Sequence, residues 1–321
     1  RSLSVANMLA IQSDIAHRVS DALRAELTPD ESDLLDAVPT ENLQAYEHYL
    51  AGVNLVSAPL NPEYVPLASQ QFEQAVEADP GFALAWIALA DTHVSESMGD
   101  GNPVARQGAR DALERAEALE PGLPQADIVR GRLAALEGNH QGALRYFESA
   151  ERVLPGDARV HRAKGRAYQL VMQLDASIAS YERAVSLDPR DPVARTWLAR
   201  VHGKMRSYDL AEAHARTAVD FNPNCGYCRW TLGAMRLYRG DEIGLIIESL
   251  TGPQGWNELS DGRIFITAFE AYLLNRDYRN AHETIDAWER LQGDGFPAEF
   301  FLAYRALIVA IQSGPAAAAM H

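Results

Sequence analysis

Small, aromatic and proline residues recur at a fixed spacing over residues 122–223, and this pattern organises the rest of the chain. The segment holds three consecutive copies of 34 residues, with prolines at the boundaries. If position 1 is the third residue after a boundary proline, positions 8, 20 and 27 are small in every copy, and position 24 is aromatic in two copies. The boundary prolines are Pro121, Pro155, Pro189 and Pro223. Position 8 is Gly131, Gly165 and Ala199, position 20 is Ala143, Ser177 and Ala211, and position 27 is Ala150, Ala184 and Ala218. Position 24 is Phe147 and Tyr181 in the first two copies and Ala215 in the third. Such a period predicts a helix–turn–helix repeat.

Close packing explains why these positions are small. Each copy is expected to form two antiparallel helices, and a large side chain at position 8, 20 or 27 would overpack their contact at a cost of about 1–3 kcal/mol. The boundary proline ends the second helix, because it lacks an N–H and disfavours helix in the residue before it. The pattern resembles the tetratricopeptide repeat (TPR) family. This resemblance implies an all-α superhelix, and we expect about six to seven repeats.

The flanking copies are less regular, and we place the whole array at residues 40–313. The first copy has an enlarged turn over Ser57–Pro62, and the second contains the extra segment SESMGDGNPVA, residues 95–105, which reads as a loop because it is rich in Gly, Pro and Ser. The sixth copy begins at Gly226 and has a short apolar second helix. A seventh pair is predicted over Arg263–Asn275 and Tyr278–Leu291.

A final helix is predicted over Ala298–Gln312, and it is apolar nearly all round. A terminal helix of a solenoid should present a polar outer face. Two interpretations remain: the chain lacks a helix that would follow, or the face is an interface. Residues 314–321 are expected to form a disordered tail.

The N-terminal segment, residues 1–39, is predicted to be a helical junction. Residues 7–27 have an apolar stripe at Ile11, Ile15, Val19 and Leu23, which either packs on the array or forms a dimer. The segment also resembles a junction in bacterial TPR regulators, on the basis of Arg1 and the run Ala10-Ile11-Gln12. This second resemblance implies the C-terminal sensory or scaffolding part of a signalling protein whose cyclase, winged-helix or Ser/Thr kinase domain comes first.

Composition limits the classes of partner. Asp and Glu outnumber Lys and Arg by 44 to 29, for a net charge of −15, so a general nucleic-acid partner is not expected. No window approaches the roughly 20 apolar residues of a membrane span. None of the nine histidines forms the paired zinc-protease motif, and no phosphate-binding glycine loop is present. We therefore expect no catalysis, no metal and no cofactor.

Cations gather where the TPR resemblance places the inner groove. In that family positions 2, 5, 9, 12 and 13 of the first helix line the concave face, and three neighbouring repeats place six cations there, followed by aromatic residues in the next repeat. Arginine suits bidentate capture of carboxylates, and Trp or Tyr suits a binding hot spot. The sequence predicts a site for an acidic or C-terminal peptide; alternatively, the arginines pair with acidic side chains on neighbouring helices. The candidate residues are Arg132, Arg159, Arg162, Arg166, Arg200, Lys204, Tyr227, Trp230 and Tyr238.

Cys225 and Cys228 are the only cysteines and lie at the predicted start of a helix. They form a local disulfide, remain two buried thiols, or act in redox catalysis, and the residues leave all three open; two cysteines cannot make a zinc site alone. A disulfide would indicate an oxidising compartment. That fits the second resemblance, since in membrane-anchored members the TPR part would lie outside the cytoplasm, so a periplasmic location is slightly favoured.

The function expected from the sequence is a non-catalytic protein-interaction and regulatory scaffold. A protein or peptide partner would occupy the groove. The alternative is an oligomerisation module, in which the N-terminal and final helices form a homodimer. A third class is a small-ligand sensor with a pocket near Trp230.

Overall fold

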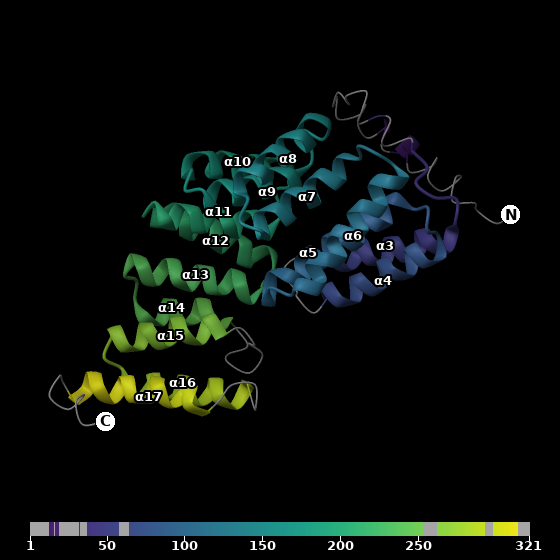
Figure 1. The fold of residues 1–321 in the computed structure, drawn as a ribbon. Coiled ribbons are helices and arrows are strands. Elements are labelled where there is room, and N and C mark those ends of the chain that lie inside the picture. Colours follow the sequence, from purple (N-terminus) through teal and green to yellow (C-terminus); the bar gives the residue numbers. More distant parts are fainter. Residues whose placement is uncertain are drawn as a thin grey trace. The chain divides into compact units, whose positions relative to one another are not determined.

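The computed structural model describes residues 13–15, 17, 18, 32, 37–57, 64–252, 262–292 and 298–313. Within these residues the regular structure is helical, and helices α3 to α17 follow one another mostly as antiparallel pairs (Figure 1). The predicted all-α architecture is confirmed. The chain divides into two compact units, residues 1–189 and residues 190–321.

Over its described residues, the first unit contains four helix pairs. Within each pair the two helices pack against each other, and the first helices also contact one another in succession, α5 with α7 and α7 with α9. The pairs are α3 (Leu43–Ser57) with α4 (Tyr64–Ala78), α5 (Ala83–Asp100) with α6 (Pro103–Leu119), α7 (Pro124–Leu136) with α8 (His140–Val153), and α9 (Ala158–Leu170) with α10 (Leu174–Leu187).

In the part of the second unit that the structure describes, there are three pairs and a last helix. Its first helices also form a row, because α11 packs on α13 and α13 packs on α15. The predicted seventh pair and final helix are confirmed to within one residue at each end. The elements are α11 (Pro192–Lys204) with α12 (Tyr208–Phe221), α13 (Gly226–Arg239) with α14 (Ile243–Thr251), α15 (Gly262–Leu274) with α16 (Tyr278–Gln292), and α17 (Ala298–Ser313).

In several pairs, an aromatic or branched side chain of the second helix lies against a glycine of the first. A Cβ atom added to Gly165 would lie 2.9 Å from the ring of Tyr181, and one added to Gly52 would lie 2.5 Å from Phe72. Both distances are too short for the ring to stay in place. The small residue at position 8 therefore makes room for the large residue at position 24, which explains why the two recur together.

An aromatic cluster forms the core at the end of the second unit. The Trp288 ring of α16 stacks on Phe265 of α15, with centroids 5.8 Å apart, and meets Phe301 of α17 edge-on at 5.5 Å. Phe301 and Ile308 of α17 are fully buried. The last helix is therefore held on one side by the core of the unit.

The extra segment of the second repeat is not a loop, so that prediction is wrong. Residues 95–100 complete α5, and α6 begins at Pro103. Gly101 ends α5 in the left-handed conformation, with φ of 71°, and the Asn102 side chain accepts hydrogen bonds from the backbone of the first turn of α6. Gly, Asn and Pro act here as helix caps, and the extra residues lengthen both helices.

Several sequence predictions fall largely outside the described residues. Of the helix predicted over residues 7–27, residues 13–15, 17 and 18 are described and helical, and Arg18 lies 3.0 Å from Asp14. Most of the enlarged turn and the tail over residues 314–321 lie outside the described residues.

Candidate functional site

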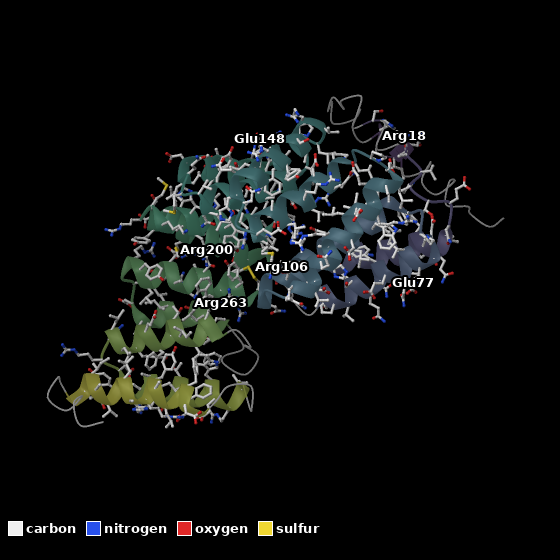
Figure 2. All side chains as sticks on the ribbon, in the orientation of Figure 1. Arg18, Glu77, Arg106, Glu148, Arg200 and Arg263 are labelled. Carbon is white, nitrogen blue, oxygen red and sulfur yellow. A yellow bond between two sulfur atoms is a disulfide. The ribbon has the colours of Figure 1, made fainter. Side chains whose placement is uncertain are left out.

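Five side chains of the second unit form what we call the arginine–aromatic cluster. Trp197 and Arg200 come from α11, Tyr227 and Trp230 from α13, and Arg263 from α15. These three helices are the successive first helices of their pairs, so the cluster crosses one continuous row (Figure 1). Arg200 and Arg263 can be located in Figure 2.

The rings of the cluster hold one another in place. The Tyr227 ring centroid lies 5.7 Å from that of Trp197 and 5.4 Å from that of Trp230. The Trp230 indole Nε1 donates a 3.0 Å hydrogen bond to Thr267 Oγ1 on α15. Packing together with this hydrogen bond fixes the Trp230 ring, so the aromatic surface is preformed.

Both arginines lie over these rings. The Arg200 guanidinium carbon is 5.1 Å from the Trp197 centroid, 5.4 Å from that of Tyr227 and 4.8 Å from that of Trp230. The Arg263 guanidinium carbon is 4.6 Å from the Tyr227 centroid and 5.1 Å from that of Trp230. All five distances are within the range of cation–π attraction. Two cations are thus stacked on the same two rings.

Arg200 is held by rings rather than by carboxylates. No carboxylate among the described residues forms an ion pair with it, and its buried Nε has no hydrogen-bond partner there. An unpaired donor on a partly buried guanidinium is costly, because removal from water is not compensated by a protein acceptor. Because Nε itself is covered, an anion could reach Arg200 only at the part of the side chain that stays exposed.

The first turn of α13, which carries Tyr227, is closed by the two cysteines. Cys225 is the N-cap residue, and its Sγ atom is bonded to that of Cys228. The Cys228 backbone N–H also donates a 3.0 Å hydrogen bond to Cys225 Sγ. Cys225 is 3% exposed and Cys228 is fully buried.

Lys204 and Tyr238 lie near the C-terminal ends of α11 and α13 in this unit. Both side chains are exposed, Tyr238 at 59%. Neither belongs to the group of stacked rings and cations that forms the cluster. The structure therefore brings Arg200, Tyr227 and Trp230 together and leaves these two outside that group.

In the first unit, the predicted groove cations described in most detail are paired with acids. Arg132 of α7 forms an ion pair with Asp91 of α5 and donates a 2.9 Å hydrogen bond to Ser95 Oγ. Arg159 of α9 forms an ion pair with Asp157 at 2.6 Å. Arg132 therefore follows the alternative, in which the arginines pair with acidic side chains on neighbouring helices, whereas Arg159 pairs with the cap residue of its own helix.

The surroundings of Arg159 extend across the row of first helices. Hydrogen bonding to Asp157 raises the pKa of Arg159, and Asp91 and Tyr49 contribute to the same environment. Burial raises the pKa of the Tyr49 hydroxyl on α3, and the Arg159 charge opposes that rise. Arg162 interacts electrostatically with Asp157, and Arg166 is half-buried on the same helix.

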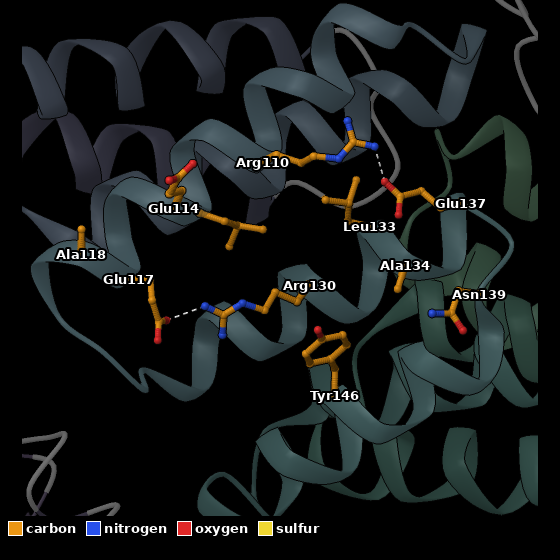
Figure 3. A pocket seen from close by; sticks show the side chains of 11 residues that line it. Arg110, Glu114, Glu117, Ala118, Arg130, Leu133, Ala134, Glu137, Asn139 and Tyr146 are labelled. Atoms are coloured by element: carbon orange, nitrogen blue, oxygen red, sulfur yellow. Dashed lines mark hydrogen bonds and ion pairs between the residues drawn. The ribbon is translucent and has the colours of Figure 1, made fainter.

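A surface hollow of about 640 Å³ also lies in the first unit, between α6, α7 and α8 (Figure 3). Its apolar lining includes Leu113 and Leu133. Four charged residues around it are already paired, Arg110 with Glu137 and Arg130 with Glu117. The hydrogen bond from Arg130 holds the pKa of Glu117 below its usual value. Because these charges compensate one another, the hollow is a weaker candidate than the cluster.

The described part of the chain lacks two other kinds of site. It contains no group of three or more His, Cys, Asp or Glu residues placed to hold a metal ion. None of its helices combines the length and the apolar character needed to cross a bilayer.

Sequence reasoning missed Trp197 and Arg263. Arg263 could have been found, because Ala281 at position 20 of the seventh pair places Arg263 at position 2, where Tyr227 lies in the sixth. Trp197 falls at position 6, outside the set of positions considered, so only the packed structure reveals its contact with Tyr227.

Comparison with known proteins bears on the fold. Residues 158–191 match the model of the tetratricopeptide repeat family. The fold is that of a TPR solenoid. The resemblance seen in the sequence is thereby supported at the level of the repeat, whereas the resemblance to multidomain signalling regulators stays a prediction. No curated protein matches the chain.

Several solved TPR structures share the architecture. A thermophilic TPR protein from Thermus thermophilus has a TM-score of 0.51 and 22% identity, covering 60% of this chain and 99% of its own. A TPR protein from Parabacteroides merdae has a TM-score of 0.51 and 12% identity, covering 83% and 99%. The Cut9–Hcn1 hetero-tetramer of the APC/C has a TM-score of 0.52 and 16% identity, and the match covers 89% of this chain and 54% of that one. At these identities the likeness shows the fold alone.

Proposed function

We propose that this chain is a non-catalytic protein-interaction module that binds an acidic segment of a partner at the arginine–aromatic cluster. TPR proteins generally mediate protein–protein interactions, and some bind peptides. The observation that carries the proposal is Arg200, a cation stacked on three rings with no carboxylate partner among the described residues.

An acidic side chain or a C-terminal carboxylate would complete this arrangement. A carboxylate can accept two parallel hydrogen bonds from one guanidinium, and such charge-assisted bonds are roughly twice as strong as neutral ones. The Trp197, Tyr227 and Trp230 rings would at the same time offer apolar surface to the neighbouring partner residues. In a chain of net charge −15, the cluster provides a local positive site for an acidic segment.

The proposed role in a larger protein follows the second resemblance. The chain would be the sensory or scaffolding part of a signalling regulator, and the partner segment would be its input. In the first unit, Arg132 and Arg159 are already paired with Asp91 and Asp157. We therefore place the main energetic contribution at Arg200, which has no carboxylate partner among the described residues.

The test is a binding measurement on the intact chain. A displayed library of peptides about 12 residues long is selected on the protein, and the strongest binder is labelled with fluorescein and titrated by anisotropy. We expect the selected peptide to be acidic. We expect R200Q/R263Q to lower its affinity at least about tenfold, since loss of one charge-assisted hydrogen bond costs roughly 1.5–3 kcal/mol.

The matched control is R276Q/R279Q, which removes two exposed arginines at the turn between α15 and α16, at the other end of α15 from Arg263. It should change affinity less than about threefold, because only long-range charge is altered. Micromolar binding that is unaffected by R200Q/R263Q but abolished by charge reversal at Arg162 and Arg166 would move the site to the first unit and contradict the proposal.

A second candidate function is self-association through α17, favoured by its outer face. The exposed side chains of α17 include Leu302 at 58%, Leu307 at 45% and Ile311 at 46%. Its one arginine, Arg305, is turned back to Asp286 and Glu289 of α16. If a second copy covers this face, L302E/V309E should turn a dimer into a monomer in light scattering, and a wild-type monomer would exclude this function.

A further inference from the structure

The ring closed by the Cys225–Cys228 disulfide contains Tyr227, the central residue of the arginine–aromatic cluster. The cysteines are three positions apart, and their Cα atoms are 5.3 Å apart. Between them lie only Gly226 and Tyr227. The backbone that carries the Tyr227 ring is therefore tied at both ends to one covalent link.

The disulfide replaces a helix cap that neighbouring first helices make with aspartate. The Asp157 side chain at the start of α9 accepts from Arg159 N at 2.8 Å, and Asp191 at the start of α11 accepts from Val193 N at 2.7 Å. At α13 the acceptor is Cys225 Sγ. Sulfur is a weak acceptor, so the covalent link takes over the task that a carboxylate performs elsewhere.

Displacement of this turn would change the whole cluster. Tyr227 touches Trp197 and Trp230 and lies beneath both Arg200 and Arg263. If the first turn of α13 frays, both cations lose one ring and Trp197 loses its neighbour. The geometry that presents Arg200 to a partner therefore depends on the closed turn.

We propose that the oxidation state of Cys225 and Cys228 controls the affinity of the cluster for its partner; this inference rests on the proposed function. In the oxidised chain the turn is closed and the site is formed. A dithiol reductant converts it to the open form: its thiolate attacks one cysteine sulfur, and its second thiol releases the mixed disulfide. The S–S bond gains two electrons and two protons to give two thiols, and the reductant leaves as its own disulfide.

Burial makes the exchange depend on opening of the turn. Because both sulfurs are covered, the reductant can reach them only when the start of α13 opens. After reduction the two thiols no longer fix the turn, and a cysteine thiol is a poor substitute for the aspartate caps of α9 and α11. The first turn of α13 should thus stay open until Cys225 and Cys228 are reoxidised.

The experiment compares the oxidised and dithiothreitol-reduced chain, with thiol content checked by mass. These are the only two cysteines, so the reductant acts at one place. Amide hydrogen exchange is followed over residues 225–233, and affinity is measured with the library-selected fluorescein peptide. We expect reduction to speed exchange of this turn about tenfold and to weaken binding about fivefold.

The variant C225D/C228A restores the aspartate cap that the neighbouring helices use. It should bind like the oxidised chain and should not respond to dithiothreitol. Unchanged exchange and affinity on full reduction of the wild type would overturn the inference, and so would a chain that diamide cannot oxidise.

The two proposals fail in different ways. If no peptide binds in either state but exchange of the turn still responds to reduction, the proposed function is wrong while the disulfide still controls the shape of the cluster. If the peptide binds equally well in both states through Arg200, the proposed function stands and the redox inference is wrong.

Discussion

Helix α13 meets arginines in two different ways on two of its sides. Toward α12, its own Arg236 and Arg239 converge on the buried Glu212, with Arg236 at 3.0 Å, and Arg239 also pairs with Asp241 at 2.6 Å. Toward α11 and α15, its rings Tyr227 and Trp230 support Arg200 and Arg263. The first arrangement satisfies its cations within the chain, and the second leaves the Arg200 cation without a carboxylate among the described residues.

The difference separates a structural contact from a binding site. Glu212 is 8% exposed and receives hydrogen bonds from three arginines, so its interactions are complete before any partner arrives. Arg200 has a buried Nε without an acceptor in the described chain. A charge that is already neutralised inside the protein is costly to unpair, whereas one that is supported but not neutralised can bind an anion.

The largest effect that we expect is a loss of stability when the Glu212 carboxylate is removed. Glu212→Gln removes the charge that holds Arg216, Arg236 and Arg239 together and leaves the partly buried Arg236 with only neutral acceptors. We expect the free energy of unfolding to fall by roughly 2–3 kcal/mol, because a buried ion pair is costly to break from one side. Urea denaturation at neutral pH measures it.

The pH dependence of this stability loss tests whether the Glu212 charge causes it. Burial alone would raise the pKa of Glu212, but hydrogen bonds from Arg236, Arg216 and Arg239 outweigh it and hold the pKa below its usual value. A carboxyl group with a lowered folded pKa contributes stability above its unfolded pKa of about 4.3 and loses it as pH falls through the folded value. The difference between wild type and Glu212→Gln should therefore shrink below about pH 4, and a constant difference would point to packing instead.

A smaller effect is expected on the other side of α13. Arg200→Gln removes cation–π contacts but breaks no ion pair with a described residue, so its cost should stay below about 1 kcal/mol in the same urea experiment. A loss as large as that of Glu212→Gln would erase the distinction between the two sides and make Arg200 a structural residue.

Much of the fold could be predicted because repeat spacing reflects packing. Gly165 and Tyr181 recur at fixed positions since one makes room for the other, and the seventh pair followed from the same rule. The misread segment at residues 95–105 shows the limit. Gly101, Asn102 and Pro103 suit a loop and a pair of helix caps equally well, and only the lengths of α5 and α6 decide between them.

The candidate site was predicted only in part. A cation at an inner position can either pair with an acidic side chain or stack on aromatic rings, and the spacing alone does not decide which. Arg132 and Asp91 both occupy position 9 of successive repeats, so their pairing could have been read from the register. The support of Arg200 depends on Trp197, which comes from a position outside the pattern, and Arg263 reaches the rings beneath Arg200 from the seventh pair. Their convergence is a property of the packed helices.

The most direct test of the central claim is a double-mutant cycle between Arg200 and the bound peptide. Affinities are measured for wild type and Arg200→Gln, each with the selected peptide and with versions in which one Asp or Glu is replaced by its amide. The account predicts one acidic position whose coupling to Arg200 is at least about 1 kcal/mol. Additivity within about 0.3 kcal/mol at every acidic position would show that Arg200 binds no acid of the partner and would contradict the account.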